Sequence, residues 1–170
     1  IRQGFSGKDI RFALAAIKGV GAGALQEIVD ARAEGGPFRD LFDFAERVPQ
    51  RALGKSAIET LLRCGAFDSI HPNRAQALAA LDQAVEAGQR LQRDKAAGQV
   101  SLFGEVEIDT PRPPLPNVPD LPREDRLAAE RELLGVYVSA HPLKSARKVL
   151  EKHVTHTLDE LSESHDGMPV

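Results

Sequence analysis

The sequence predicts an all-α fold, and its composition and its periodicity both favour this class. Strong helix formers, above all Ala, Leu, Glu, Arg and Gln, are abundant, whereas Trp is absent and Tyr occurs once. Apolar residues recur at intervals of three and four through the first 98 residues, the spacing that places side chains on one face of a helix. The length of 170 residues suits one domain with an appendage.

The first predicted unit consists of two short helices around a glycine-rich turn. Ile10, Leu14 and Ile17 precede the glycines at positions 19, 21 and 23, and apolar residues at helical spacing follow over residues 25–29. This order of elements predicts a helix-hairpin-helix unit.

Signals for helix starts predict three further helices in residues 1–98. Asp40 can cap a helix that ends before Pro49. Ser56 and Glu59 have capping-box spacing at the start of the next helix, and Asn73 can cap a longer one. The last two flank a second turn, so residues 1–98 are predicted to be a tandem helix-hairpin-helix domain.

The charge is distributed unevenly along the chain. The net charge of -3 divides into +2 for residues 1–98 and -5 for residues 99–170. A surface that binds the nucleic-acid backbone is therefore expected in the first part.

The glycine-rich turn is suited to binding phosphate without reading base sequence. Glycines at 19, 21 and 23 permit positive φ and carry no Cβ, so backbone N–H groups can approach a large anion. The N-terminus of the following helix adds unsatisfied donors and a partial positive charge. Phosphate contacts set position and carry no sequence information. The predicted DNA-binding residues of this turn are Lys18, Gly19, Val20, Gly21, Ala22 and Gly23.

Two other interpretations of this turn remain. It could be a plain helix–helix turn with C-cap glycines. Gly19-Val20-Gly21 followed by Ala24, with Asp40 further on, also matches a dinucleotide-binding fingerprint. The second interpretation is disfavoured because the preceding segment has helical spacing and no Val/Ile-rich strands follow.

The second turn has Gly65-Ala66-Phe67 in place of Gly-x-Gly, so both a phosphate contact and a structural role remain open for it. Gly65 and Arg74 are predicted to contact DNA, although Arg74 could equally be a solvated surface residue. Phe67 is expected to fill the core between the two units.

A short apolar segment after Gly98 predicts a partner site. Leu102 and Phe103 lie between a charged helix end and an acidic stretch, where burying them in the chain's own core is difficult. The alternative is a loop that folds them back on the preceding helix. The predicted binding residues are Gln99, Ser101, Leu102 and Phe103.

The remaining sequence predicts a linker and a connector. Six prolines between residues 111 and 122 favour a semi-rigid polyproline spacer, so residues 99–122 are assigned to peptide and linker. Residues 123–170 are predicted to be a helical connector to a further domain, with helices over 124–134 and 143–153.

Neither a metal site nor a hydrolase site is predicted. The only cysteine, Cys64, excludes an internal disulfide, and no Cys-x-x-Cys pair accompanies the five histidines. Ser139 near His141 has no acidic partner in sequence. The chain begins at Ile1 and has no leader or long apolar run, so it is expected to be a piece of a larger cytoplasmic protein.

Four segments together resemble the bacterial DNA polymerase III alpha subunit, the C-family replicative polymerase. They are the stretch 10–21 with the first hairpin, Gly65-Ala66-Phe67-Asp68 with Asn73-Arg74, the stretch 98–104, and the stretch 132–143. The resemblance covers nearly the whole chain. It implies that residues 99–103 are the pentapeptide that docks on the sliding clamp, and that an OB-fold domain follows.

The resemblance also has implications for activity. The parent protein is expected to be a DNA-directed DNA polymerase of chromosomal replication, with catalytic carboxylates and Mg²⁺ in an earlier palm domain. This segment is expected to contain no catalytic residue, no cofactor and no metal. Its expected partners are double-stranded DNA, the sliding clamp and the other polymerase domains and subunits. A non-catalytic repair adaptor, and an error-prone member of the same family, remain as alternatives.

Overall fold

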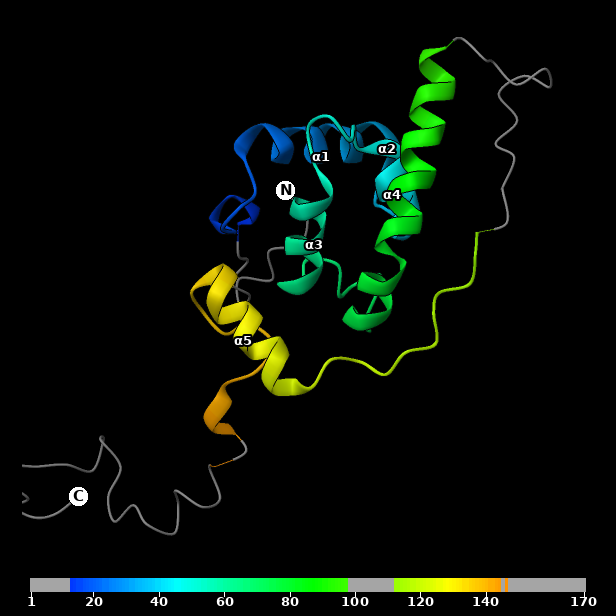
Figure 1. Ribbon diagram of the computed structural model, residues 1–170. Coiled ribbons are helices and arrows are strands. Elements are labelled where there is room, and N and C mark those ends of the chain that lie inside the picture. Colours follow the sequence, from blue (N-terminus) through cyan, green and yellow to red (C-terminus); the bar gives the residue numbers. More distant parts are fainter. Residues whose placement is uncertain (1–12, 98–111, 145, 147–170) are drawn as a thin grey trace, which may run out of the picture.

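All regular elements in the described part of the chain are helical, which confirms the predicted fold class. The structure is a computed structural model that describes residues 13–97, 112–144 and 146 (Figure 1). The helices are η1 (Leu14–Ala16), α1 (Ala22–Gly35), α2 (Leu41–Arg47), α3 (Lys55–Arg63), α4 (Arg74–Ala96), α5 (Arg123–Leu134) and η2 (Pro142–Lys144).

The centre of the fold is the packing of α2 against the long helix α4. Small side chains on α4 let the two helices approach closely, and a Cβ built at Gly88 would lie 2.2 Å from the carbonyl oxygen of Ala45. Glycine is required at position 88 because any side chain would push α2 away. The buried apolar face of α4 consists of Ala77, Ala80, Leu81, Ala84 and Val85.

The predicted caps of α2 and α4 are confirmed. The carboxylate of Asp40 accepts a hydrogen bond from the backbone N–H of Asp43 at 2.9 Å. The side-chain oxygen of Asn73 accepts one from the backbone N–H of Gln76 at 3.0 Å. Each bond satisfies a donor that has no partner within its helix.

The predicted starts of two other helices differ from the structure. Helix α3 begins at Lys55 after Gly54 and has no side-chain cap. The prediction of a capping box formed by Ser56 and Glu59 is therefore wrong. Ser56 lies inside the first turn, where its side chain cannot take the N-cap position. Of the first predicted helix, the described part contains the single 3-10 turn Leu14–Ala16.

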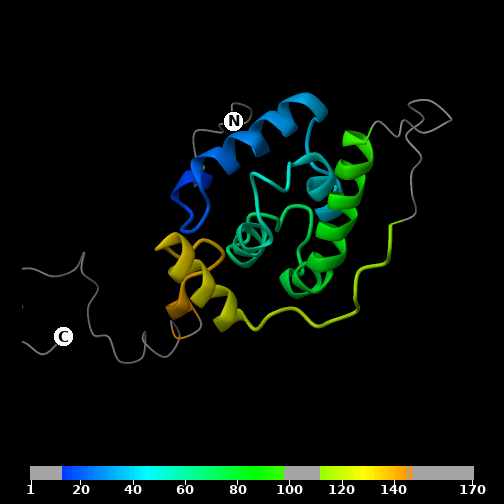
Figure 2. The same cartoon turned by 45° about the horizontal axis from the view of Figure 1, so that its top comes forward.

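The prediction that the proline-rich segment is a spacer is wrong for residues 112–122. They lie extended along one side of the bundle, from near α4 to the start of α5 (Figures 1 and 2). The side-chain amide of Asn73 donates to the carbonyl of Val118 at 2.9 Å, and Leu115 packs against the core. Prolines keep this strap extended, and side chains of the α4 start anchor it.

Helix α5 forms where the sequence predicts it and belongs to the same body as the preceding helices. Leu127 and Ala129 are buried, and α5 lies against α3. The backbone N–H of Lys18 donates to the carbonyl of Leu133 at 3.0 Å, which joins the first hairpin to the end of α5. Most of the helix predicted over residues 143–153 lies outside the described residues.

Candidate nucleic-acid interface

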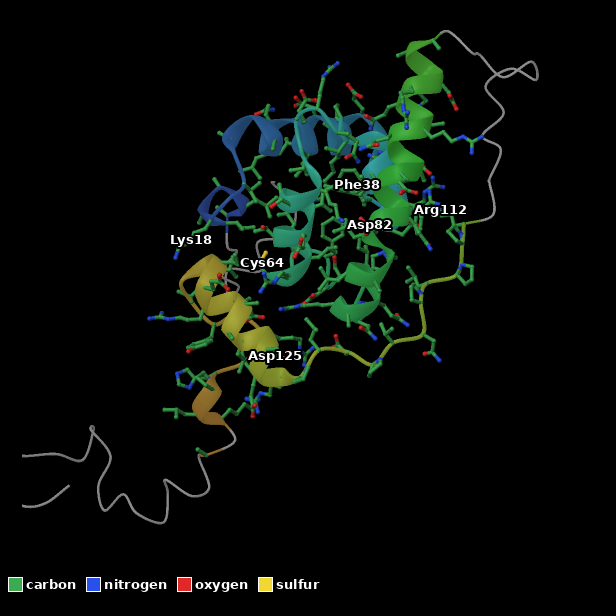
Figure 3. All side chains as sticks on the ribbon, in the orientation of Figure 1. Lys18, Phe38, Cys64, Asp82, Arg112 and Asp125 are labelled. Carbon is green, nitrogen blue, oxygen red and sulfur yellow. The ribbon has the colours of Figure 1, made fainter. Side chains whose placement is uncertain are left out.

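The first hairpin, residues 17–23 and hereafter hairpin 1, is attached to the core by its apolar residues. Ile17 and Val20 are 5% and 9% exposed, respectively, and both pack in the main core. Lys18 and Gly19 lie between them and are exposed, and the Lys18 side chain points away from the bundle (Figure 3). The hairpin therefore presents Gly19 and one cation, the Lys18 side chain, to solvent from a fixed base.

The three glycines of hairpin 1 have different roles. Only Gly19 has positive φ, at +82°, so it alone requires glycine for its backbone conformation. Gly21 is extended, with φ -73° and ψ 152°, and Gly23 lies in α1. The positive φ that glycine permits is thus adopted at Gly19 and not at the other two. A Cβ at any of the three would meet no atom of the described residues within 4 Å, so this part of the structure leaves the backbone open.

The start of α1 carries backbone donors without a helical acceptor. Gly21 is the N-cap and supplies no side-chain hydrogen bond. The first bond from the helix back to Gly21 is made by the N–H of Leu25, at 3.2 Å. Among the described residues the N–H groups of Ala22, Gly23 and Ala24 have no acceptor, so they remain for water or a ligand at the positive end of a helix of 14 residues. This arrangement can bind an anion such as a phosphodiester.

The second hairpin, residues 64–73 and hereafter hairpin 2, begins with a Schellman turn at the end of α3. The N–H of Ala66 donates to the carbonyl of Leu61 at 2.9 Å, and the N–H of Gly65 donates to that of Leu62 at 3.1 Å. Gly65 has φ +84°, close to that of Gly19. Its backbone N–H is thus used inside the fold.

The space beside Gly65 is occupied by the guanidinium of Arg74. A Cβ at Gly65 would lie 2.2 Å from Arg74 Nη2. The Arg74 side chain is 2% exposed, and its Nε and Nη2 donate to the two carboxylate oxygens of Asp68 at 2.9 and 2.7 Å. The prediction that Arg74 lies on the surface, as a DNA contact or a solvated residue, is wrong. Its side chain is buried, already donates to protein acceptors and stabilises hairpin 2.

Glu130 of α5 completes this buried network. Its Oε1 accepts from Arg74 at 2.8 Å, and its Oε2 accepts from the backbone N–H groups of Val138 and Ser139 at 2.8 and 2.9 Å. Burial alone would raise the pKa of Glu130, but the donors from Ser139, Arg74 and Val138 hold that pKa below its usual value. The carboxylate therefore stays ionised and joins α5 to hairpin 2.

Phe67 fills the core as predicted. It is 6% exposed, and its ring lies edge-on to that of Phe44, with 4.9 Å between the ring centroids. Hairpin 2 is thus attached to α2 by an aromatic pair and to α5 by ion pairs.

The predicted clamp-binding residues Gln99, Ser101, Leu102 and Phe103 lie outside the described residues. The chain on either side of them is anchored. Before them, α4 ends at Ala96, and after them Arg112 forms ion pairs with Asp40 and with Glu46, the latter at 3.5 Å. Both anchors lie at the α2–α4 side of the bundle.

The sequence interpretation missed Glu130 and its role in the fold. One signal was available, because Leu127, Glu130 and Leu134 have helical spacing and so place a carboxylate on the apolar face of α5. A charge on such a face requires a buried partner. The sequence does not identify Arg74, 56 residues earlier, as that partner.

Other chemistry has little support among the described residues. No group of three or more His, Cys, Asp and Glu side chains there could hold a metal ion. Cys64 is buried, which raises the pKa of its thiol, and its Sγ donates to the carbonyl of Leu61 at 3.3 Å. No helix in this part of the chain is long and apolar enough to cross a membrane.

Comparisons with known proteins identify the family. Residues 2–77 match the helix-hairpin-helix motif family. The chain is 42% identical over 152 residues to the DNA polymerase III subunit alpha of Caulobacter vibrioides, an alignment that covers 89% of the chain and 13% of the relative. It is 40% identical to that of Vibrio cholerae, over 89% of the chain and 13% of the relative. For Thermus aquaticus the identity is 37%, over 99% of the chain and 14% of the relative. The chain thus belongs to the DNA polymerase III subunit alpha family and corresponds to about one eighth of the length of these relatives.

Proposed function

We propose that this chain is the part of a bacterial replicative DNA polymerase that holds duplex DNA by its backbone and tethers the enzyme to the sliding clamp. The parent protein would be a DNA-directed DNA polymerase in the cytoplasm, with its catalytic carboxylates and Mg²⁺ in another domain. The names of the relatives support this proposal.

The observation that carries the DNA-binding part of the proposal is the open backbone of hairpin 1. Gly19 and Gly21 have no neighbour within 4 Å of a built Cβ, the start of α1 lacks a side-chain cap, and Lys18 is exposed beside it. Backbone donors and one cation would bind phosphate oxygens without contacting base edges. Binding would therefore be independent of sequence and strongly weakened by salt.

The experiment compares two glycine variants that each place a side chain at a position of positive φ. Gly19→Ala and Gly36→Ala each place a Cβ at positive φ, +82° and +72° respectively, with no atom within 4 Å. We expect Gly19→Ala to weaken binding of a random-sequence duplex about tenfold, the loss of about one charge-assisted hydrogen bond. Gly36→Ala should bind like the unaltered chain in the same fluorescence anisotropy titration. Equal affinities of both folded variants would exclude hairpin 1 as the DNA site.

The clamp-binding part rests on the form Gln-x-x-Leu-Phe over residues 99–103. In such a peptide the glutamine amide would anchor the backbone, and the Leu-Phe pair would fill an apolar pocket. Replacing Gln99, Leu102 and Phe103 with alanine should abolish binding to purified sliding clamp. Retained clamp binding by this triple variant would contradict the assignment.

The two contacts would reinforce each other. A ring around the duplex raises the effective concentration of DNA at hairpin 1, so neither contact needs to be tight alone. The parent polymerase that carries the triple alanine variant should therefore synthesise shorter products. Its rate of nucleotide addition after it has bound a primer should be unchanged.

A further inference from the structure

The end of α4 carries a second basic surface, on the opposite side of the bundle from hairpin 1 in both views (Figures 1 and 2). An open hollow there is lined by Gln50, Arg51, Gln89, Gln92, Arg93 and Ala96. This lining contains two guanidinium groups and three carboxamides but no carboxylate. We call the exposed residues Arg51, Gln89 and Arg93 the α4-end patch.

The α4-end patch is held in place by part-buried hydrogen bonds at its base. The amide of Gln92 donates to the carbonyls of Ala45 and Val48 at 3.1 and 2.9 Å, and its oxygen accepts from the N–H of Gln50 at 3.2 Å. The turn that carries Arg51 is closed by the N–H of Leu53, which donates to the carbonyl of Pro49 at 3.2 Å. Leu53 itself is 1% exposed. These contacts hold the turn that carries Arg51 beside α4.

The charges of this patch are not balanced within the described part of the chain. Arg39, Arg47 and Arg74 each form ion pairs with carboxylates there. No ion pair of the described residues includes Arg51 or Arg93. The negative end of the α4 dipole stabilises part of the positive charge of Arg93. Arg51 lies on a separate turn and has no such interaction with a helix of its own.

Two cations that line the same hollow repel each other, and an anion bound between them would relieve this repulsion. We infer that the α4-end patch binds phosphates of the duplex, as a second contact in addition to hairpin 1. Guanidinium and carboxamide groups are both common donors to phosphate oxygens. The inference rests on the proposed function, which supplies the duplex as occupant.

The position of the patch fits that occupant. Gln99 follows Ala97 by two residues, so a clamp bound to the peptide would lie within a short length of chain from the end of α4. Duplex that runs through the ring would pass near this end of the bundle. The two contacts would then hold the DNA at two separated points.

The test uses charge neutralisation at exposed positions, where folding is expected to be unaffected. Arg51→Gln with Arg93→Gln removes two cations from the patch, and Arg32→Gln with Lys144→Gln removes two exposed cations elsewhere. The affinity of the 170-residue chain for a random-sequence duplex is measured by fluorescence anisotropy over a series of KCl concentrations. We expect the patch variant to bind about tenfold more weakly. The slope of log affinity against log salt should fall by about two relative to the control.

The outcomes separate this inference from the proposed function. If Gly19→Ala weakens binding but the patch variant equals the control in affinity and slope, the α4-end patch is excluded and the proposed function stands. If the unaltered chain has no duplex affinity, both fail. If the patch variant loses affinity for purified clamp and keeps its affinity for DNA, the occupant is protein and the inference is wrong.

Discussion

Hairpin 1 and hairpin 2 have nearly the same φ at their central glycines, but the surroundings of the two glycines differ. Gly19 and Gly65 have φ of +82° and +84°. The space beside Gly19 is open, whereas the guanidinium of Arg74 occupies the space beside Gly65. Helix α1 after hairpin 1 starts without a side-chain cap, and α4 after hairpin 2 is capped by Asn73.

The difference shows that a glycine turn before a helix does not by itself make an anion site. In hairpin 2 the donors and the free volume are used by Asn73, Asp68 and Arg74, and this stabilises the fold. In hairpin 1 the N–H groups at the start of α1 have no acceptor among the described residues, which costs stability and leaves them for a ligand. Substitutions in and around the two hairpins test this contrast.

Replacing Arg74 with methionine should cause the largest loss of stability. The change leaves the carboxylate of Glu130, which is 0% exposed, without its cation. Breaking a buried ion pair in this way costs about 3–5 kcal/mol. Urea unfolding followed by circular dichroism should show this loss, while Lys18→Met, at an exposed site in hairpin 1, should unfold like the unaltered chain. A loss below about 1 kcal/mol would contradict the role assigned to Arg74.

Alanine at the two central glycines should separate the hairpins by stability. Gly65→Ala combines positive φ with a clash against Arg74, and we expect it to cost about 3 kcal/mol. Gly19→Ala has a similar positive φ but no described atom beside it, so it should cost about 1 kcal/mol. The free energies of unfolding are measured side by side in urea. Equal losses would mean that Arg74 does not constrain position 65.

Acid should destabilise the chain in two steps through groups around hairpin 2. Burial lowers the pKa of His71 from 6.5, and its Nε2 accepts from the N–H of Leu41 at 2.9 Å. Because the folded pKa is lower than the unfolded one, the unfolded state binds more protons, and stability falls as the pH drops below 6.5. The lowered pKa of Glu130 adds a second loss below 4.5.

The variant His71→Gln isolates the first step, since a glutamine oxygen can still accept from Leu41. Its free energy of unfolding should change little between neutral pH and pH about 5, where the unaltered chain loses stability. A similar decline in both proteins would assign the loss to another group.

The smallest effect is expected from Gly21→Ser, which gives hairpin 1 the kind of cap that hairpin 2 has. Serine is a better N-cap than glycine by a few tenths of a kcal/mol, and the extended backbone of Gly21 accepts it. The variant should therefore be slightly more stable. It should also bind duplex more weakly, because its hydroxyl takes a donor at the start of α1. Unaltered DNA affinity in the more stable variant would show that these donors do not contact phosphate.

Local signals in the sequence predicted much of the fold. Asp40 and Asn73 cap the helices they were predicted to cap, and α5 begins within one residue of its predicted start. Ser56 and Glu59 had the right spacing for a capping box, but Gly54 takes the N-cap position, because the chain direction at a helix start depends on what the helix packs against. The predicted spacer packs along the bundle because Asn73 and Arg74, distant in sequence, bind it.

The sequence alone determined the helical class, the two glycine turns and the resemblance that the relatives confirm, since these depend on residues within a few positions of one another. The tertiary structure decided which turn stays open. Arg74, Asp68 and Glu130 come together only when α5 packs on α3. The free energy of a buried charge depends on partners that folding brings from far along the chain, and no local pattern contains that information.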